Sequence, residues 1–464
     1  MLIPFVVLYL LVTVAIGFWA SRRVKNTQDF VVAGRRLPLF MAASVMFATW
    51  FGSETILGAS SEFVNHGLIG VIEDPFGAAL CLFLVGLIYA RPLYRMNILT
   101  FCDYFRIRYH KSVEVISAAF IVPTYIAWIA AQLLAMAIVL EAISGLDMTT
   151  GVLISSGLVM LYTFTGGMWS VSITDFMQTI LIIVGMVILT VIMVNRAGGV
   201  VTVIEAAPSG FFEFFPERSW DGWVHYVVAW ITIGLGAIPQ QDIFQRVMAA
   251  RSERVAVRAS YLSAGMYLSI GMLPLLIALC ARQLYPDLAL EVEGQGILPQ
   301  MVLQHTGLAL QILFFGALLS AIMSTSSGAM LAPASVIGEN LVRHLYPKLT
   351  DKQLLRIIRF SVLGVGLASI GLALQGGKIY DLVGYAATFS LVSLFVPLTA
   401  GLFWKRANTL GALVSAVLGM AVWLVAEILG TETPSIVWGF GASVLGMAAS
   451  FLRPATPSAV PDRL

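Results

Sequence analysis

Phe314–Asn340, which reads FFGALLSAIMSTSSGAMLAPASVIGEN, is the most informative segment for the fold. As a helix with a rise of about 1.5 Å per residue, it is long enough to cross the ~30 Å hydrocarbon core of a membrane. Ala321, Ser324 and Thr325 stand at positions i, i+3 and i+4, so they share one face of this helix. Small residues and hydroxyls on such a face favour one of two roles. They either allow close helix packing, with hydroxyls bonded back to their own helix, or they supply oxygens that replace the water shell of a small hard cation.

The composition of the 464 residues is that of a membrane protein, since 59% are hydrophobic, 11% are charged and the mean hydropathy is +0.90. Thirteen apolar runs of membrane-spanning length follow one another: 2–20, 38–60, 70–92, 113–143, 150–167, 172–194, 222–245, 258–281, 308–341, 357–375, 380–403, 409–429 and 434–452. The net charge of +2 gives no indication of nucleic acid binding. No loop is long enough for a soluble catalytic domain, so we expect an all-α, multi-pass protein of the cell membrane, of the bacterial-type inner or plasma membrane, that is not an enzyme.

The basic residues are distributed unevenly around these runs. If the N-terminus lies outside, only four of the 27 lysines and arginines fall on the outer side: Arg196, Arg218, Arg282 and Lys378. Cytoplasmic loops carry the excess of basic residues, so this distribution predicts an outside N-terminus, an odd number of spans and an inside C-terminus. Arg246 is counted in one of the inside loops.

The second run is interrupted near its middle, in Phe47–Thr55, by Gly52 and Ser53. Glu54 follows the interruption and lies near mid-membrane depth, where an ionisable group costs at least ~3 kcal/mol. It is therefore a candidate for a site, the alternative being a carboxylate satisfied by a neighbouring helix. The third run begins with Glu73, Asp74 and Pro75, a sequence typical of a helix N-terminus.

The seventh run is also interrupted, at Gly234, Gly236 and Pro239. Two interrupted helices five spans apart predict two inverted repeats of five helices with a binding site at the midplane. The predicted division is an extra N-terminal helix and cytoplasmic loop (1–37), a ten-helix core (38–404, with repeats 38–195 and 221–404), two peripheral helices (405–453) and a cytoplasmic tail (454–464).

Two further features concern the fourth and sixth spans. Tyr125, Trp128 and Gln132 recur at i, i+3 and i+7, which makes one polar and aromatic stripe on the fourth span, for packing or for a ligand. Asp175 stands in the first turn of the sixth span, where a carboxylate stabilises a helix N-terminus whatever else it does.

Several of these stretches together resemble the sodium:solute symporter family, whose members share the ten-helix inverted-repeat fold of the leucine transporter. The stretches are Asp29–Leu37, Ala48–Gly58, Thr165–Asp175, Gly236–Arg246 and Ala321–Thr325. Within the family, the ATW of the second span and the AIPQQDIFQR of the seventh are most similar to the high-affinity choline transporter branch.

The resemblance implies a sodium site of five oxygens. Its ligands are the carbonyls of Ala48, Phe51 and Ala321 and the hydroxyls of Ser324 and Thr325. Uncharged oxygens in this number suit Na⁺, which gains less than a divalent ion from carboxylates.

Some family members hold a second sodium ion. The matching positions for this possible second site are Asp175 and Ser327, but Gly328 stands where another hydroxyl is wanted. We therefore expect a single coupling ion.

The resemblance also implies a solute site beside the broken helices. Trp50 and Trp128 match an aromatic cage, which attracts a cation to its ring faces, and Gln240 stands where that cage has a tryptophan. Glu54 and Thr55 match positions that hydrogen-bond a polar solute, and Tyr125 is expected to face the same region. Arg and Lys are absent from the span centres, which disfavours an anion.

These observations predict a secondary active transporter that couples the inward flow of Na⁺ to uptake of a small polar or cationic organic solute by alternating access. One alternative is a proton-coupled permease of the same fold, with Glu54 or Asp175 as the proton carrier. A second is a sensor that binds the solute without transporting it, which the short C-terminal tail disfavours.

Overall fold

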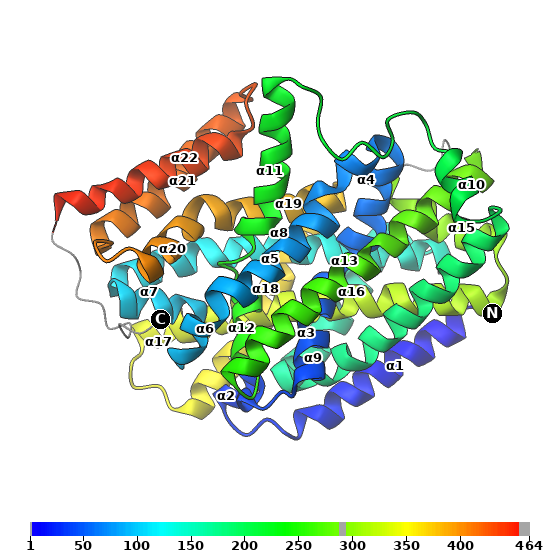
Figure 1. Ribbon diagram of the computed structural model, residues 1–464. Helices are drawn as coiled ribbons and strands as arrows, with labels where there is room; N and C mark the ends of the chain where they lie inside the picture. Colours follow the sequence, from blue (N-terminus) through cyan, green and yellow to red (C-terminus); the bar gives the residue numbers. More distant parts are fainter. Residues whose placement is uncertain (1, 287–293, 454–464) are drawn as a thin grey trace.

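The computed structural model describes residues 2–286 and 294–453, and this part of the chain is almost entirely helical (Figure 1). The α-helices are α1 (Leu2–Ser21), α2 (Thr27–Val32), α3 (Leu39–Trp50), α4 (Ala59–His66), α5 (Ala78–Leu84), α6 (Ala90–Arg95), α7 (Phe101–Arg108), α8 (Lys111–Ser144), α9 (Met148–Arg196), α10 (Val200–Glu205), α11 (Trp220–Gly236), α12 (Gln241–Ala249), α13 (Glu253–Leu284), α15 (Ile297–His305), α16 (Leu308–Val336), α17 (Arg343–Leu345), α18 (Asp351–Ala373), α19 (Ile379–Ser390), α20 (Val396–Phe403), α21 (Thr409–Leu429) and α22 (Ser435–Met447). Short 3-10 or π segments adjoin them: η1 (Ala33–Arg35), η2 (Glu54–Gly58), η3 (Leu68–Val71), η4 (Ile72–Gly77), η5 (Val85–Tyr89), η6 (Gly294–Gly296), η7 (Ile337–Val342), η8 (Leu391–Phe395) and η9 (Ala448–Leu452).

Within the described residues, ten helices are long and apolar enough to cross a membrane, or up to twelve if each of two bent pairs is one span. The first bent pair, Leu39–Trp50 with Glu54–His66, turns by 55° across Gly52 and Ser53. The second, α11 with α12, turns by 47° across a segment that contains Pro239. Both interruptions predicted from the sequence are confirmed.

Helix α9 accounts for the difference from the predicted thirteen runs. Its 49 residues would extend roughly 74 Å as one straight helix, more than twice the hydrocarbon thickness. Gly167 interrupts it with a left-handed backbone, φ 51° and ψ −149°, so α9 consists of two helices joined at a kink. The kink falls in the turn expected between the fifth and sixth runs. Counting its two parts separately gives thirteen spans, and that count and the orientation stay predictions.

The core of the molecule is built around α16. Every residue from Ala317 to Val336 is buried, which a helix in contact with lipid on one side does not achieve. Helix α16 packs against α9, α8, α18, α3, α12 and α1. The small residues and hydroxyls of this stretch therefore face other helices on all sides.

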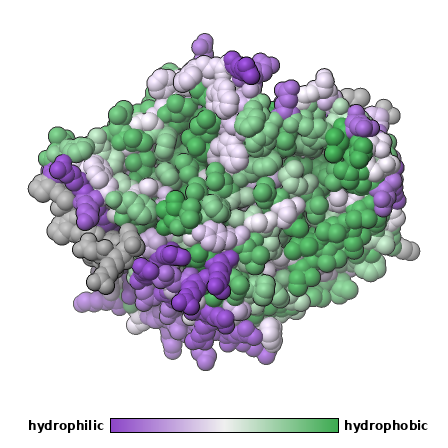
Figure 2. All heavy atoms as spheres, in the orientation of Figure 1, coloured by the Kyte–Doolittle hydropathy of each residue, from purple (hydrophilic) through white to green (hydrophobic). Residues whose placement is uncertain are grey.

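The periphery is apolar and faces outward. Large hydrophobic side chains are exposed along α1, for example Leu11 at 61%, and along α21 and α22, for example Ile428 at 75% and Leu445 at 74%. Figure 2 shows this surface as a broad hydrophobic band, with hydrophilic residues gathered below it around α2, α6 and α17. The band is the surface that a bilayer covers. The predicted division into core and peripheral helices stays a prediction, and the tail at 454–464 lies outside the described residues.

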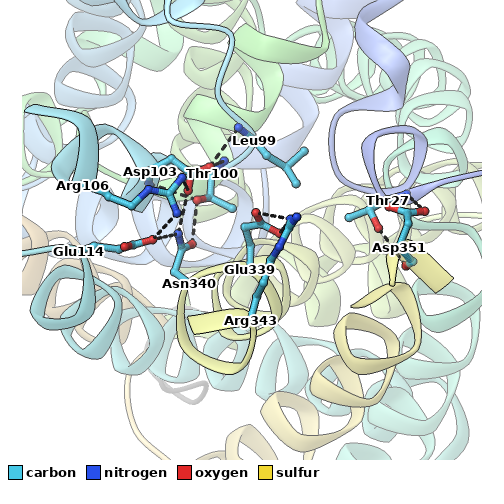
Figure 3. A network of polar contacts seen from close by, with 10 residues as sticks. All are labelled: Thr27, Leu99, Thr100, Asp103, Arg106, Glu114, Glu339, Asn340, Arg343 and Asp351. Carbon is cyan, nitrogen blue, oxygen red and sulfur yellow. Dashed lines mark hydrogen bonds and ion pairs between the residues drawn. The ribbon is translucent and has the colours of Figure 1, made fainter. Parts of the chain in front are cut away.

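A network of polar contacts joins the ends of several helices on the predicted cytoplasmic side (Figure 3). At its centre is Asn340, fully buried in η7. Its Oδ1 accepts a hydrogen bond from Thr100 at 2.7 Å, while its Nδ2 donates to Asp103 at 3.1 Å and to Glu114 at 2.9 Å. Arg106 forms ion pairs with the same two carboxylates, at 3.0 and 3.2 Å. These contacts fasten the end of the α16 span to α7 and to the start of α8.

Candidate functional site

The break after α3 brings a main-chain carbonyl against the hydroxyl face of α16. Ser324 Oγ lies 2.8 Å from the carbonyl oxygen of Ala48 and 2.6 Å from Oδ1 of Asp175. Thr325 Oγ1 lies 3.3 Å from the same carbonyl, and all four residues are fully buried. A serine hydroxyl has one hydrogen, so Ser324 can satisfy only one of its two acceptors. The cluster therefore contains more oxygen lone pairs than hydrogens, an arrangement that suits a cation.

The two remaining predicted sodium ligands lie beside this cluster. Phe51 directly follows α3 and has a ψ of 76°, which turns its carbonyl out of the helical hydrogen-bond pattern. Ala321 is buried on α16, one turn before Ser324 and Thr325. The structure thus brings three of the five predicted ligands into direct contact and sets the other two at the adjoining break and turn.

The prediction that Asp175 caps a helix N-terminus is wrong. The helix after the kink begins at Met168, so Asp175 lies beyond its first turn and its side chain reaches across to Ser324 on α16. Its Oδ2 has no hydrogen-bond partner within the described residues. The hydroxyl of Ser327 donates to the carbonyl of Ser324 at 2.9 Å and not to Asp175.

Arg246 also belongs to this region, and its burial here was not predicted from the sequence. The sequence predicts it in an inside loop, but it lies on α12 in the core, where it is fully buried. Nε donates to Thr49 Oγ1 at 2.9 Å, and Nη1 donates to the carbonyl of Asp242 and to Gln245 Oε1, both at 3.3 Å. Nη2 packs against Gly328, where an added Cβ would collide with it. The missing hydroxyl at position 328 thus makes room for a guanidinium group.

Glu54, just past the break, is held by the polar stripe of α8. Its Oε1 accepts from Nε1 of Trp128 at 3.2 Å, and its Oε2 accepts from Nε2 of Gln132 at 2.8 Å. Gln132 also accepts from the main-chain nitrogen of Ser53 at 3.1 Å, so it links the break to α8. A neighbouring helix thus satisfies Glu54, which also lines a pocket.

This pocket lies between the two broken helices and has a volume of about 30 Å³, room for only about two water molecules. It is lined by Trp50, Glu54, Asp74, Ala78, Trp128, Ile233, Ala237, Gln240, Tyr267, Val383, Ala386 and Ala387. Four of the six predicted solute residues are among them. An organic solute needs side chains to move before it fits.

The other two predicted solute residues, Thr55 and Tyr125, do not line this pocket but hold carboxylates near it. Thr55 donates to Asp74 Oδ2 at 2.7 Å, and Tyr125 donates to Asp242 Oδ1. Asp242 also accepts from Nε1 of Trp50 at 2.7 Å. Both aspartates were missed. The sequence predicts Asp74 as part of a helix N-terminus, yet it lies inside the long segment Leu68–Arg95. The signal that could have found it is an acidic residue within an apolar run.

The ion cluster and the pocket meet at Gly52. A Cβ at this position would lie 2.6 Å from Glu54 Oε2, 2.6 Å from Thr325 Oγ1 and 2.9 Å from Gln132 Oε1. Such distances are too short for any real Cβ contact, so glycine is required where these groups converge. Thr325, a candidate sodium ligand, and Glu54, a candidate solute ligand, therefore both approach Gly52 closely.

Comparison with known proteins gives consistent results. The family model for the sodium:solute symporter family matches residues 30–419. The chain is 28% identical over 461 residues to high-affinity choline transporter 1 of Caenorhabditis elegans, covering 93% of this chain and 78% of that one. It is 27% identical over 479 residues to the osmoregulated proline transporter OpuE of Bacillus subtilis, covering 97% and 95%. A substrate-bound, outward-open Na⁺-coupled sialic acid symporter superposes with a TM-score of 0.86 at 20% identity, covering 98% of both chains, which shows a shared fold.

Proposed function

This chain belongs to the sodium:solute symporter family and is a membrane transporter, not an enzyme, and on that premise we propose that it couples inward Na⁺ flow to uptake of a small polar or cationic organic solute. The proposed Na⁺ ligands are Ala48, Phe51, Ala321, Ser324 and Thr325. The solute binds in the pocket between the two broken helices, and alternating access releases both to the cytoplasm.

The observation that carries this proposal is the convergence at Gly52. Na⁺ bound between the α3 break and α16 fixes Thr325 and the break in one arrangement. Glu54 Oε2 and Thr325 Oγ1 both lie close to Gly52, so the same arrangement sets where the Glu54 carboxylate points. If bound Na⁺ raises the affinity for the solute, bound solute raises the affinity for Na⁺ by the same factor.

The lining of the pocket supports a positively charged group on the solute. Glu54 and Asp74 are both buried, and the described lining includes no lysine or arginine. A buried carboxylate is tolerated when it is paired or hydrogen-bonded, and tryptophan faces such as those of Trp50 and Trp128 attract cations. Choline and proline, for which the relatives are named, both contain a charged nitrogen.

The buried guanidinium of Arg246 supports a single coupling ion. It packs against Gly328, the residue that follows Ser327 on α16. Positive charges held close together away from water repel each other. The guanidinium thus disfavours a second Na⁺ at Asp175 and Ser327.

We expect Asp175→Asn to raise the Na⁺ concentration for half-maximal uptake several-fold while the Hill coefficient for Na⁺ stays near one. The amide still accepts a hydrogen bond from Ser324, but the negative charge beside the ion cluster is lost. Na⁺ titration of uptake measures both quantities. Asp147→Asn is the matched control, since Asp147 is a helix cap that accepts from the main-chain nitrogen of Thr150 at 3.0 Å. A wild-type Hill coefficient near two that falls to one in Asp175→Asn would establish the second ion instead.

The decisive test of the function is uptake by purified protein in proteoliposomes, with a panel of labelled organic cations, zwitterions and anions. Na⁺ and H⁺ gradients are imposed in turn. Accumulation of a cation or zwitterion that requires the Na⁺ gradient supports the proposal. Accumulation that follows a pH gradient and ignores Na⁺ would identify a proton-coupled permease, and binding without accumulation would identify a sensor.

A further inference from the structure

Asp74 is a buried carboxylate whose hydrogen bonds are incomplete. It lies in η4, is 1% exposed and lines the solute pocket together with Glu54. Its Oδ2 accepts from Thr55 Oγ1 at 2.7 Å. Its Oδ1 has no hydrogen-bond partner within the described part of the chain. One acceptor of a residue that lines the pocket is therefore left without a donor.

Three of the donors around the pocket are engaged elsewhere. Nε1 of Trp50 donates to Asp242 and Nε1 of Trp128 donates to Glu54. The hydroxyl of Tyr267 donates to the carbonyl of Trp50 at 2.9 Å. A buried acceptor without a donor is costly, and the cost is larger for a charged group. A solute that donates to Asp74 removes this cost, whereas one that cannot donate leaves it in place.

A larger, acidic cavity, here called the vestibule, adjoins the pocket on the side predicted to be outside. It has a volume of about 600 Å³ and its lining includes five carboxylates: Glu62, Glu73, Asp381, Glu427 and Glu432. Glu73 lines this vestibule and the next residue, Asp74, lines the pocket. A cleft lined by charges of one sign raises the local concentration of ligands of the opposite sign, so this approach favours cations.

We propose that Asp74 selects solutes whose positively charged nitrogen carries at least one hydrogen, so that a protonated amine is preferred to a quaternary ammonium. The inference rests on the proposed function, because it takes the solute to be positively charged. Both classes of nitrogen satisfy the charge of Glu54 and the tryptophan faces. Only the protonated amine can donate to Asp74 Oδ1.

A series of probes separates charge from hydrogen-bond donation. Ethanolamine, N-methylethanolamine, N,N-dimethylethanolamine and choline each carry one positive charge, with three, two, one and no N–H groups. Their affinities are measured by direct binding to purified protein in Na⁺, and their Na⁺-driven uptake is measured in proteoliposomes. We expect N,N-dimethylethanolamine to bind at least about ten-fold more tightly than choline, because the last N–H is lost at that step.

The variant Asp74→Asn tests whether this residue is the cause. The ratio between N,N-dimethylethanolamine and choline is expected to fall below about three-fold, because a neutral amide accepts a hydrogen bond from a cation more weakly. Glu73→Gln is the matched control in the vestibule and is expected to shift all four affinities by a similar factor. Unequal shifts in Glu73→Gln, or an unchanged ratio in Asp74→Asn, would contradict the assignment to Asp74.

The wild-type protein alone can overturn the inference, even if the variant does not fold. Choline bound as tightly as N,N-dimethylethanolamine, with Na⁺-driven uptake, would refute the role of Asp74 and leave the proposed function intact. Failure of all four probes to bind protein that binds Na⁺ would refute both this inference and the cationic solute.

Discussion

Ser324→Ala is expected to raise the Na⁺ concentration for half-maximal uptake by about ten-fold or more, and Thr325→Ala by a smaller factor. Ser324 Oγ lies 2.8 Å from the Ala48 carbonyl and 2.6 Å from Asp175, whereas Thr325 Oγ1 is 3.3 Å from that carbonyl. Removing a ligand from a buried charge costs roughly 1.5–3 kcal/mol, and 1.4 kcal/mol is a factor of ten. The measurement is the Na⁺ dependence of uptake at saturating solute, with the amount of folded protein determined for each variant.

Ser326→Ala is the matched control on the same helix. Ser326 is equally buried, but its hydroxyl donates back to the carbonyl of Ile322 at 2.6 Å, so its loss removes no oxygen from the cluster. We expect its Na⁺ dependence to stay within about two-fold of the wild type. Equal effects of Ser324→Ala and Ser326→Ala would show that the hydroxyls serve packing, which is the other role open to this helix.

Glu54→Gln is expected to weaken binding of a cationic solute at least about ten-fold and to change Na⁺ affinity less. The substitution removes the charge at nearly unchanged size, and the single amide oxygen can accept from only one of the two donors, Trp128 or Gln132. Trp50→Ala is expected to weaken the same solute, because it removes an aromatic face worth about 0.5–2 kcal/mol to a cation. Solute affinity and Na⁺ affinity are measured separately on each variant.

Glu427→Gln is the control for this pair. Glu427 lies in the acidic vestibule, where it accepts from Tyr385 at 3.0 Å, and does not line the pocket. We expect at most a two-fold change in solute affinity, because a charge exposed to solvent is well screened. Tight binding of a monocarboxylate that survives Glu54→Gln would contradict the cationic solute and leave the Na⁺ site untouched.

Features that depend on neighbours along one helix could be predicted from the sequence alone. Apolar run length predicted the spans, and Gly52 and Pro239 predicted the two breaks that the structure contains. Helical periodicity placed Ser324 and Thr325 on one face of α16 and Trp128 and Gln132 on one face of α8. These properties are local, because the geometry of a single helix fixes which of its side chains point the same way.

The partner that each of these faces contacts depends on how the helices pack, which the sequence did not reveal. Hydropathy located Arg246 and Asp74 near helix ends, yet packing buries both, one against Gly328 and the other beside the solute pocket. Asp175 was expected to stabilise its own helix, but a hydroxyl from a distant part of the chain is its partner. The physical reason is that a charge inside a membrane protein must be compensated by whichever groups the helix packing brings to it, and these come from segments far apart in sequence.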